Sequence, residues 1–473
     1  MSESMKKGLK IAIPIIIGVV IALIQPPDGL TQQAMIYMGI FECVVVWLML
    51  GAVPDWAAFL ACISAYVVFN VAKFGVVFAP FADSTVWLLI GAFGMTCALI
   101  KTGLVKRLAF GILSMFPESY KGQLSAFYVA GFAITPWIPA KIGKGVMVTP
   151  IAAVATKALG YPARSKAATG IFLAVWVTTG ILGYAFLTGA APVMVTIGML
   201  PAEQQESWTW MGWLGACAMW LVVVAVLSYI VLLLLYGPKK GADNDGVKTD
   251  FEKGFAKKQL REMGPMSREE KLTAVLVLIA IIGWIFGSKV GLSAPIISVG
   301  VFAIMAVIGL VDTKDLTTGI PWDTAIFIGG ILSLASLLTQ LGISTWIATL
   351  MEPVAGPIVA NPYIYVAAVC VLTYFARLVV VSSTATQVIF LAALGGVASA
   401  AGINPFVTLF VCLCSTAVWH LPFTNNEFIP LLGTQKGEMC EHADTLPFNY
   451  AYMAINLVAC LASVPIWQVM GLM

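Results

Sequence analysis

Charged residues are scarce in this chain of 473 residues. Asp, Glu, Lys and Arg make up only 10% of it, whereas 60% of the residues are hydrophobic and the mean hydropathy is +0.95. Soluble domains carry about 25% charged residues, so this composition excludes a soluble globular protein and indicates an integral membrane protein. The hydrophobic runs have the length of helices, which excludes an outer-membrane barrel. The expected fold class is therefore an all-α polytopic membrane protein.

The sequence also lacks the signatures of several functional classes. No Gly-x-x-x-x-Gly-Lys-Ser/Thr loop occurs, so ATP is not the expected energy source. Because there are only two histidines and no paired carboxylates in the apolar segments, an enzyme is the weakest reading. Cys412 and Cys414 point in different directions on a helix, so no metal site is expected there. The net charge of +3 gives no indication of nucleic-acid binding, and no cofactor is expected.

The distribution of Lys and Arg predicts the topology. The longest polar segment, 237–271, holds nine of the 26 basic residues, so the positive-inside rule places it in the cytoplasm together with the N-terminus. The N-terminus shows no signal-peptide cleavage site. Eleven membrane spans are expected near residues 11–26, 34–52, 56–78, 84–101, 167–198, 210–236, 272–289, 293–311, 323–342, 405–433 and 448–470. The C-terminus would then lie outside, and the membrane is expected to be a bacterial inner (plasma) membrane.

Two further apolar stretches, 123–156 and 354–400, are each too long for one helix and are interrupted by a polar motif. Basic residues flank both ends of the first stretch and neither end of the second, so we expect two re-entrant hairpins that enter from opposite faces. Residues 84–104 align without gaps to residues 323–343, so the two halves are expected to be inverted repeats. This is the plan of many secondary transporters, with the site at the repeat interface.

The hairpin tips and two interrupted spans supply the candidate site. The first tip, PWIPAKIGKGVMVTP at 136–150, contains Lys141, and an ammonium in an apolar segment is a functional candidate by default. The alternative is a lysine that snorkels to the cytoplasmic face. The second tip carries Ser382, Ser383 and Thr384 at a helix start, where a carboxylate would be stabilised. The alternative is that these hydroxyl groups bond to their own backbone.

The interrupted spans are FLTGAAPV at 186–193 and CSTAVWHLPFTNNEF at 414–428. Proline frees a carbonyl group that can bind a cation, although an ordinary kink is the alternative. For Arg377 the sequence supports two roles equally: it binds a substrate carboxylate, or it forms a structural ion pair. The substrate-binding candidates are Lys141, Ser382, Ser383, Thr384, Thr188, Thr424, Asn425 and Arg377. The ion-coupling candidates are Gly143, Gly189, Pro192, Ser382, Thr384, Glu427 and His420.

These motifs resemble those of the divalent anion:sodium symporter (DASS) family, especially its bacterial citrate/succinate and plastid 2-oxoglutarate/malate branch. The family's first tip reads P-S-N-T-A-R-G-G-x-x-x-P. Here Pro139 and Pro150 keep the spacing, whereas Ala140, Lys141 and Ile142 stand in the places of Ser, Asn and Thr. The second tip is closer to the family's S-x-T-A. FLTGAAPV resembles F-L-T-x-x-A-P-N, but with Val at the last position.

The resemblance implies an elevator-type homodimer that carries di- or tricarboxylates with sodium or in exchange for another carboxylate. The moving transport domain would comprise residues 123–236 and 354–473, and the scaffold residues 1–122 and 272–353, with 237–271 as a cytoplasmic linker. In the family the first tip and the Asn after Ala-Pro form a sodium site. This chain lacks those oxygen ligands at Ala140, Ile142 and Val193.

Lys141 would therefore supply the positive charge that sodium brings in the family, whereas Lys144 is expected to be interfacial or to replace the family's Arg. The main expectation is a dicarboxylate exchanger with little or no sodium dependence. The alternatives are sodium- or proton-coupled symport of the same fold, with Glu427 or His420 as the proton site, and an anion channel. A sulfonate, an aromatic acid or a longer diacid remains possible as the cargo.

Overall fold

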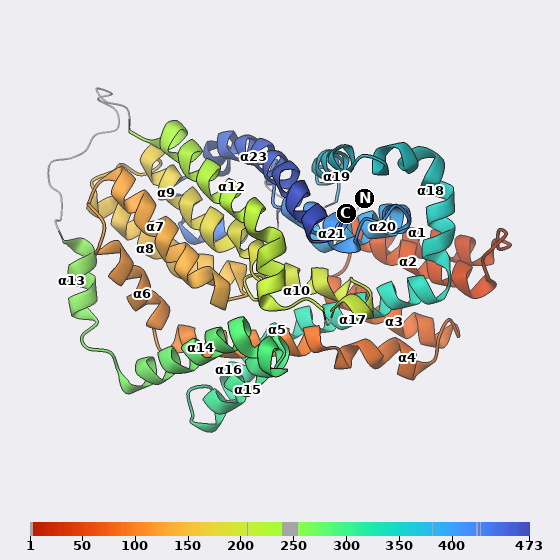
Figure 1. The fold of residues 1–473 in the computed structure, drawn as a ribbon, viewed down its shortest axis with the longest axis horizontal. Helices are drawn as coiled ribbons and strands as arrows, with labels where there is room; N and C mark the ends of the chain where they lie inside the picture. Colours follow the sequence, from red (N-terminus) through yellow and green to blue (C-terminus); the bar gives the residue numbers. More distant parts are fainter. Residues whose placement is uncertain (1–2, 206, 239–253, 381, 422–423, 426) are drawn as a thin grey trace.

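The computed structural model describes residues 3–205, 207–238, 254–380, 382–421, 424–425 and 427–473, and within them every regular element is a helix (Figure 1). Eight helices of the described part are long and apolar enough to cross a membrane. The all-α polytopic fold class predicted from the sequence is thus confirmed.

Residues before the linker form twelve α-helices in the described part of the chain. They are α1 (Glu3–Leu23), α2 (Gln32–Leu50), α3 (Asp55–Val68), α4 (Phe74–Phe78), α5 (Ser84–Lys101), α6 (Leu104–Leu113), α7 (Tyr120–Ile134), α8 (Lys141–Ala158), α9 (Lys166–Trp176), α10 (Ala191–Gly198), α11 (Ala202–Gln205) and α12 (Trp210–Tyr236). A π-helical turn, Val177–Ile181, and a 3₁₀ turn, Leu182–Ala185, follow α9 directly.

The second half has a matching series of helices. They are α13 (Phe255–Glu262), α14 (Arg268–Phe286), α15 (Ala294–Val307), α16 (Thr313–Gly319), α17 (Trp322–Gln340), α18 (Ile343–Val359), α19 (Pro362–Ala376), α20 (Ser383–Ala400), α21 (Pro405–Ser415), α22 (Phe428–Thr434) and α23 (His442–Val469). Both long apolar stretches fold as helix–break–helix hairpins, α7–α8 and α19–α20. Each is followed by an interrupted helix, α9–α10 or α21–α22.

The repeat predicted from residues 84–104 and 323–343 is confirmed in the packing. α15 packs against α5, and in the other half the equivalent α3 packs against α17, so the two contacts are reciprocal. Gly103 and Gly342 occupy equivalent junctions after α5 and α17, with left-handed φ angles of 76° and 71°. A side chain is disfavoured in that conformation, which explains why the glycine occurs in both repeats.

Two of the expected boundaries are wrong. The span expected at 56–78 is two helices, because Asn70 adopts a left-handed φ of 54° after α3. The second hairpin begins at Pro362, not at residue 354, because residues 343–359 form the separate helix α18. Asn361 starts the hairpin: its Oδ1 accepts hydrogen bonds from the backbone N–H groups of Tyr363 and Ile364 at 3.0 and 3.3 Å. Proline at the first helical position suits such a start.

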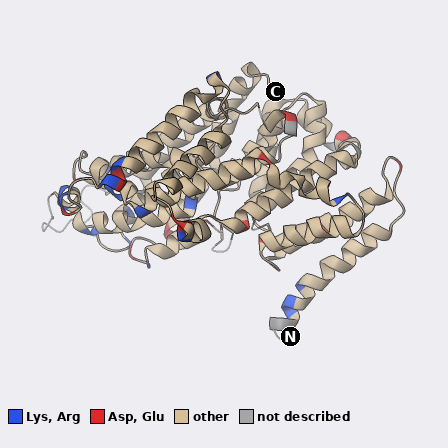
Figure 2. Ribbon diagram, turned by 90° about the horizontal axis from the view of Figure 1, so that it is seen from below, with Lys and Arg blue, Asp and Glu red and all other residues tan. Residues whose placement is uncertain are grey.

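Most charged residues lie near the helix ends, and the long helices consist almost entirely of uncharged residues (Figure 2). Arg107 after α5 binds Glu270 at the start of α14, with Nε–Oε1 at 2.7 Å, and donates to the carbonyl oxygen of Gly264 at 2.8 Å. Lys101 binds both Asp312 and Asp315, and this hydrogen bonding lowers the pKa of Asp312 to about 2. These ion pairs join the two halves along one face.

Candidate functional site

The first hairpin tip is bonded to the interrupted helix of its own half. Residues 135–140 connect α7 to α8. The hydroxyl group of Thr188 donates to the carbonyl oxygen of Pro136 at 2.6 Å, and the backbone N–H of Ala191 donates to that of Pro139 at 3.1 Å. Thr188 also accepts a hydrogen bond from Trp210 at 3.1 Å. Pro192 lies in the first turn of α10, so the break is at residues 186–190 and not at a proline kink.

Lys141 is the first residue of α8 and lies between the two halves. It is 4% exposed, and its Nζ donates to the carboxylate of Glu427, which comes from the break between α21 and α22. The same Nζ donates to the hydroxyl oxygen of Tyr184 at 2.7 Å and lies 4.3 Å from the centre of that ring. A snorkelling lysine is excluded by these contacts. The ammonium is positioned to bind a carboxylate.

Lys144 is completely buried, which excludes the interfacial position and leaves the other expectation, that it replaces the family's Arg. Its Nζ donates to the carbonyl oxygen of Gly189 at 2.7 Å and lies 3.5 Å from that of Thr135. One helical turn separates Lys141 from Lys144, so both side chains lie on the same face of α8. The helix α8 packs against α9 and α22. Gly143, between them, is partly exposed and lies in the first turn of α8.

The second tip is held by Arg377 and Ser382. Arg377 is completely buried; its guanidinium donates to the carbonyl oxygen of Val380 at 2.8 Å and to that of Thr424 in the α21–α22 break. The hydroxyl group of Ser382 accepts from the backbone N–H of Ala385 at 3.2 Å and so caps α20. Ser383 and Thr384 are partly exposed in the first turn of α20. Arg377 therefore links the tip to the interrupted helix.

Thr424 and Asn425 bond to the backbone of their own break. Thr424 Oγ1 donates to the carbonyl oxygen of Leu421 at 2.9 Å. Asn425 Oδ1 accepts from the N–H groups of Glu427 and Phe428 at 3.1 and 2.9 Å, which starts α22. In this conformation the two side chains shape the break. Pro422 and Asn426, which belong to the same predicted motif, lie outside the described residues.

His420 is partly exposed, and its Nδ1 lies 3.2 Å from Nδ2 of Asn449 on α23. Three residues that contribute to the site were not predicted: Tyr184, Trp176 and Gln387. Tyr184 and Trp176 lie on either side of the π-helical turn, a feature often found at functional sites. No sequence pattern marked it. Gln387 accepts from Thr196 at 2.6 Å, which links α20 to α10.

The first tip and the residue after Pro192 lack the side-chain oxygens that a sodium ion would need. Ala140, Ile142 and Val193 have no side-chain oxygen, and the carbonyl oxygens of Gly189 and Thr424 already accept from Lys144 and Arg377. Among the described residues, no group of three or more His, Cys, Asp or Glu could hold a metal ion. The tips instead bring three basic side chains, Lys141, Lys144 and Arg377, around the one carboxylate of Glu427. This excess of positive charge suits an anion.

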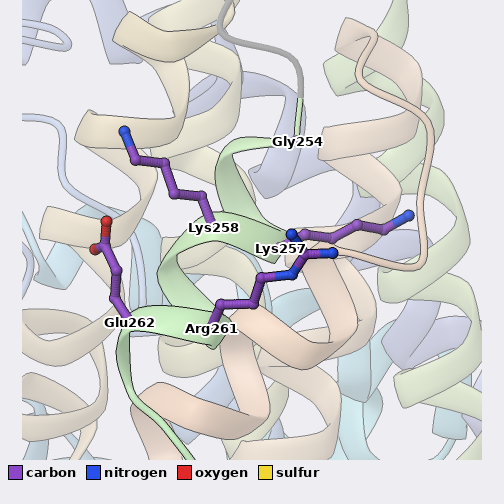
Figure 3. A pocket seen from close by; sticks show the side chains of 5 residues that line it. All are labelled: Gly254, Lys257, Lys258, Arg261 and Glu262. Atoms are coloured by element: carbon purple, nitrogen blue, oxygen red, sulfur yellow. The ribbon is translucent and has the colours of Figure 1, made fainter.

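The large surface recess on α13 is a separate feature. It has a volume of about 570 Å³ and is lined by Gly254, Lys257, Lys258, Arg261 and Glu262 (Figure 3). A neighbouring recess of about 270 Å³ lies between α13 and the ends of α6, α7 and α8. Neither recess is lined by a residue of the hairpin tips. The candidate site is therefore the buried junction of tips and broken helices.

The fold and this junction define a multi-pass membrane transporter with a site suited to anions. The family model described as "Sodium:sulfate symporter transmembrane region" matches residues 5–438. The chain belongs to this family, which confirms the resemblance to the divalent anion:sodium symporters.

Several relatives share most of their length with the chain. The "Inner membrane protein YbhI" of Escherichia coli K12 is 28% identical over 73% of this chain and 72% of its own. "Dicarboxylate transporter 1, chloroplastic" of Spinacia oleracea is 25% identical over 84% of this chain and 70% of its own. The "Putative malate transporter YflS" of Bacillus subtilis is 24% identical over 74% of this chain and 73% of its own. The crystal structure of the Alcanivorax borkumensis YdaH transporter shares the fold, with a TM-score of 0.54 and 14% identity over 98% of this chain and 96% of that one.

Proposed function

We propose that the protein is a secondary active transporter that exchanges small organic dianions, most simply dicarboxylates, across a bacterial inner membrane. The observation that carries the proposal is the contact between Lys141 and the Glu427 carboxylate at the junction of the two repeats. A carboxylate already binds at this point, so a carboxylate of the substrate can bind there in its place. The names of the plastid and Bacillus relatives, which refer to dicarboxylate and malate, support the same class of substrate.

The transport domain in this proposal comprises residues 123–236 and 362–473, and the scaffold residues 1–122 and 272–361, because the second hairpin begins at Pro362. The bonds between hairpins and broken helices, together with the packing of α12 on α23, support movement of these elements as one body. The N-terminus and the linker 237–271 lie in the cytoplasm, and the C-terminus lies outside. The protein works as a homodimer through its scaffold.

Lys141 supplies the positive charge that a sodium ion would otherwise bring to the substrate. Because the ammonium is covalently attached, it cannot be released with the cargo. A transport domain whose charge is balanced by bound substrate crosses the membrane at lower cost than an unbalanced one. Substrate would therefore bind on each side before the domain returns, which is exchange.

The contact between Lys141 and Glu427 also favours a second candidate, proton-coupled symport. A substrate carboxylate that binds Lys141 would displace the Glu427 carboxylate and leave it without its partner, so that a proton carried by Glu427 would replace the ammonium. One proton would then be taken up with each dianion. The two candidates share the site and differ in whether substrate binding changes the bulk pH.

Counterflow in proteoliposomes tests the proposal. Vesicles that contain the purified protein are loaded with succinate or malate, and uptake of the labelled compound from outside is measured. We expect internal dicarboxylate to accelerate uptake, because a carrier returns faster when loaded. Uptake of equal rate in empty vesicles would contradict exchange, and a current proportional to the gradient without saturation would indicate a channel.

A further inference from the structure

We propose that each half of the transporter carries its own fixed cation in a carbonyl-lined cation site, Lys144 in the first half and Arg377 in the second. Removal of the Lys144 side chain would open the first of these sites to a small monovalent cation from solution. The inference concerns how the tips are held, and only its transport consequence rests on the proposed function.

The surroundings of Lys144 are those of a cation site. Its two acceptors are carbonyl oxygens at helix breaks: Thr135 is the C-cap of α7, and Gly189 precedes α10. Such oxygens have no helical partner and are natural cation ligands. They accept hydrogen bonds only, so the group that fills the site has to be a donor or a cation. The oxygens belong to different elements, so the cation joins the hairpin tip to the broken helix.

Gly189 fixes one of these oxygens in place. A Cβ at Gly189 would lie 2.5 Å from the carbonyl oxygen of Gly183 and 2.9 Å from Cβ of Phe186. The hydroxyl group of Thr188 is bonded to Pro136, which holds the same turn from the other side. We expect this close packing to keep the carbonyl group of Gly189 in its direction when the Lys144 side chain is shortened.

Arg377 repeats the arrangement in the second half from a different position. It is the C-cap of α19, as Thr135 is the C-cap of α7. Its guanidinium also joins a tip carbonyl, that of Val380, to a carbonyl of the broken helix, that of Thr424. Lys144 is the fourth residue of α8, and the fourth residue of α20 is Thr386. Each repeat thus places a basic side chain between a tip carbonyl group and a carbonyl group of the broken helix. In the first repeat this side chain comes from the helix after the tip, and in the second from the helix before the tip.

The test replaces Lys144 and adds the cation back. In the Lys144→Ala variant we expect a lower melting temperature than in the wild type when choline is the cation. Ammonium, methylammonium or sodium at the same ionic strength should raise that temperature in a saturable manner. The wild type should not respond, because its site is filled. Lys144→Met is the matched control: it removes the charge but fills the volume, so these cations should not stabilise it.

Uptake of succinate gives a second readout. We expect Lys144→Ala to lose about tenfold or more of its uptake in choline, the scale of a lost hydrogen bond to a charged group, and to recover it in part with ammonium or sodium. The melting experiment needs no substrate, so failure of succinate uptake in the wild type would affect the proposed function alone.

The inference is overturned if Lys144→Ala melts at the same temperature in all four salts, or if the cations stabilise Lys144→Met and the wild type as much as they stabilise Lys144→Ala. Recovery of folded Lys144→Ala protein only when ammonium or sodium is present during purification would support it. Failure to recover this variant in any of the salts would contradict it, because a refilled site should restore the packing.

Discussion

Lys141 and Glu427 form the contact on which the functional account depends. Each is a member of a different repeat, and Glu427 is more accessible than Lys141, with 19% of its side chain exposed against 2%. A buried ion pair of this kind is rarely retained for stability alone, because its desolvation offsets the attraction between the charges. Glu427 is therefore best understood as a carboxylate that competes with the substrate for Lys141.

Replacing Glu427 tests this competition. In Glu427→Gln the amide can still accept a hydrogen bond from Lys141 but does not neutralise its charge. We expect a lower KM for succinate, because the internal competitor is weakened. If protons are coupled, the dependence of uptake on a pH gradient should also disappear. Glu438→Gln, at an exposed carboxylate that pairs with Lys157, is the control and should leave both properties unchanged. A higher KM in Glu427→Gln would mean that the carboxylate positions Lys141 for the substrate.

The sequence predicted part of this arrangement. Lys141 could be singled out because a lysine in an apolar hairpin is costly unless it has a partner, and because it stands in the place of the family's Asn. Its partner could not be identified, since Glu427 lies 286 residues further along the chain and also fits the cytoplasmic end of a helix. The sequence left two positions open for Lys144 for a related reason: its acceptors are backbone carbonyl groups, which no sequence pattern shows.

At the scale of the element, the helix starts at the hairpin tips combine a structural and a binding role. Ser382 caps α20 through its hydroxyl group, and the same hydroxyl was predicted to bind substrate. The first tip has no such cap, because Ala140 precedes Lys141. The two tips therefore differ in chemistry although they are related by the repeat.

Two substitutions at Ser382 separate its roles. Loss of an N-cap hydroxyl costs about 1 kcal/mol when alanine replaces serine but only a few tenths when glycine does. We expect Ser382→Ala to lower the melting temperature more than Ser382→Gly does. If the hydroxyl also binds substrate, both variants should bind succinate more weakly, by roughly 1–3 kcal/mol. Normal affinity in Ser382→Gly would restrict the residue to capping.

At the scale of the whole molecule, the inverted repeat could be predicted from the aligned glycines and from the charges that flank each hairpin. The two wrong helix boundaries lie where the local backbone conformation determines where a helix ends. The span at 56–78 divides at Asn70, and α18 was merged with the hairpin because both are apolar and no basic residue separates them. Periodicity and hydropathy cannot place a boundary between two apolar helices, whereas the cap at Asn361 does.

The ion pair of Arg107 with Glu270 holds the two halves together at one face. Their side chains are 14% and 5% exposed, so Arg107→Ala would leave a nearly buried carboxylate without its main partner. We expect a loss of stability of about 2 kcal/mol, measured as a lower denaturation midpoint in detergent. Lys101→Ala breaks a more exposed pair and should have a much smaller effect. Equal effects of the two substitutions would show that Arg107 has no special role.

The most direct test of the account compares succinate uptake by the wild type and by Lys141→Ala in proteoliposomes, with sodium, potassium or choline as the external cation. The account predicts that wild-type uptake is the same in all three salts, because Lys141 supplies the charge at the site. It also predicts that Lys141→Ala takes up almost no succinate, since the dianion loses its partner and Glu427 is left unpaired. Wild-type uptake that rises steeply and saturably with sodium, together with near-normal uptake by Lys141→Ala, would contradict it.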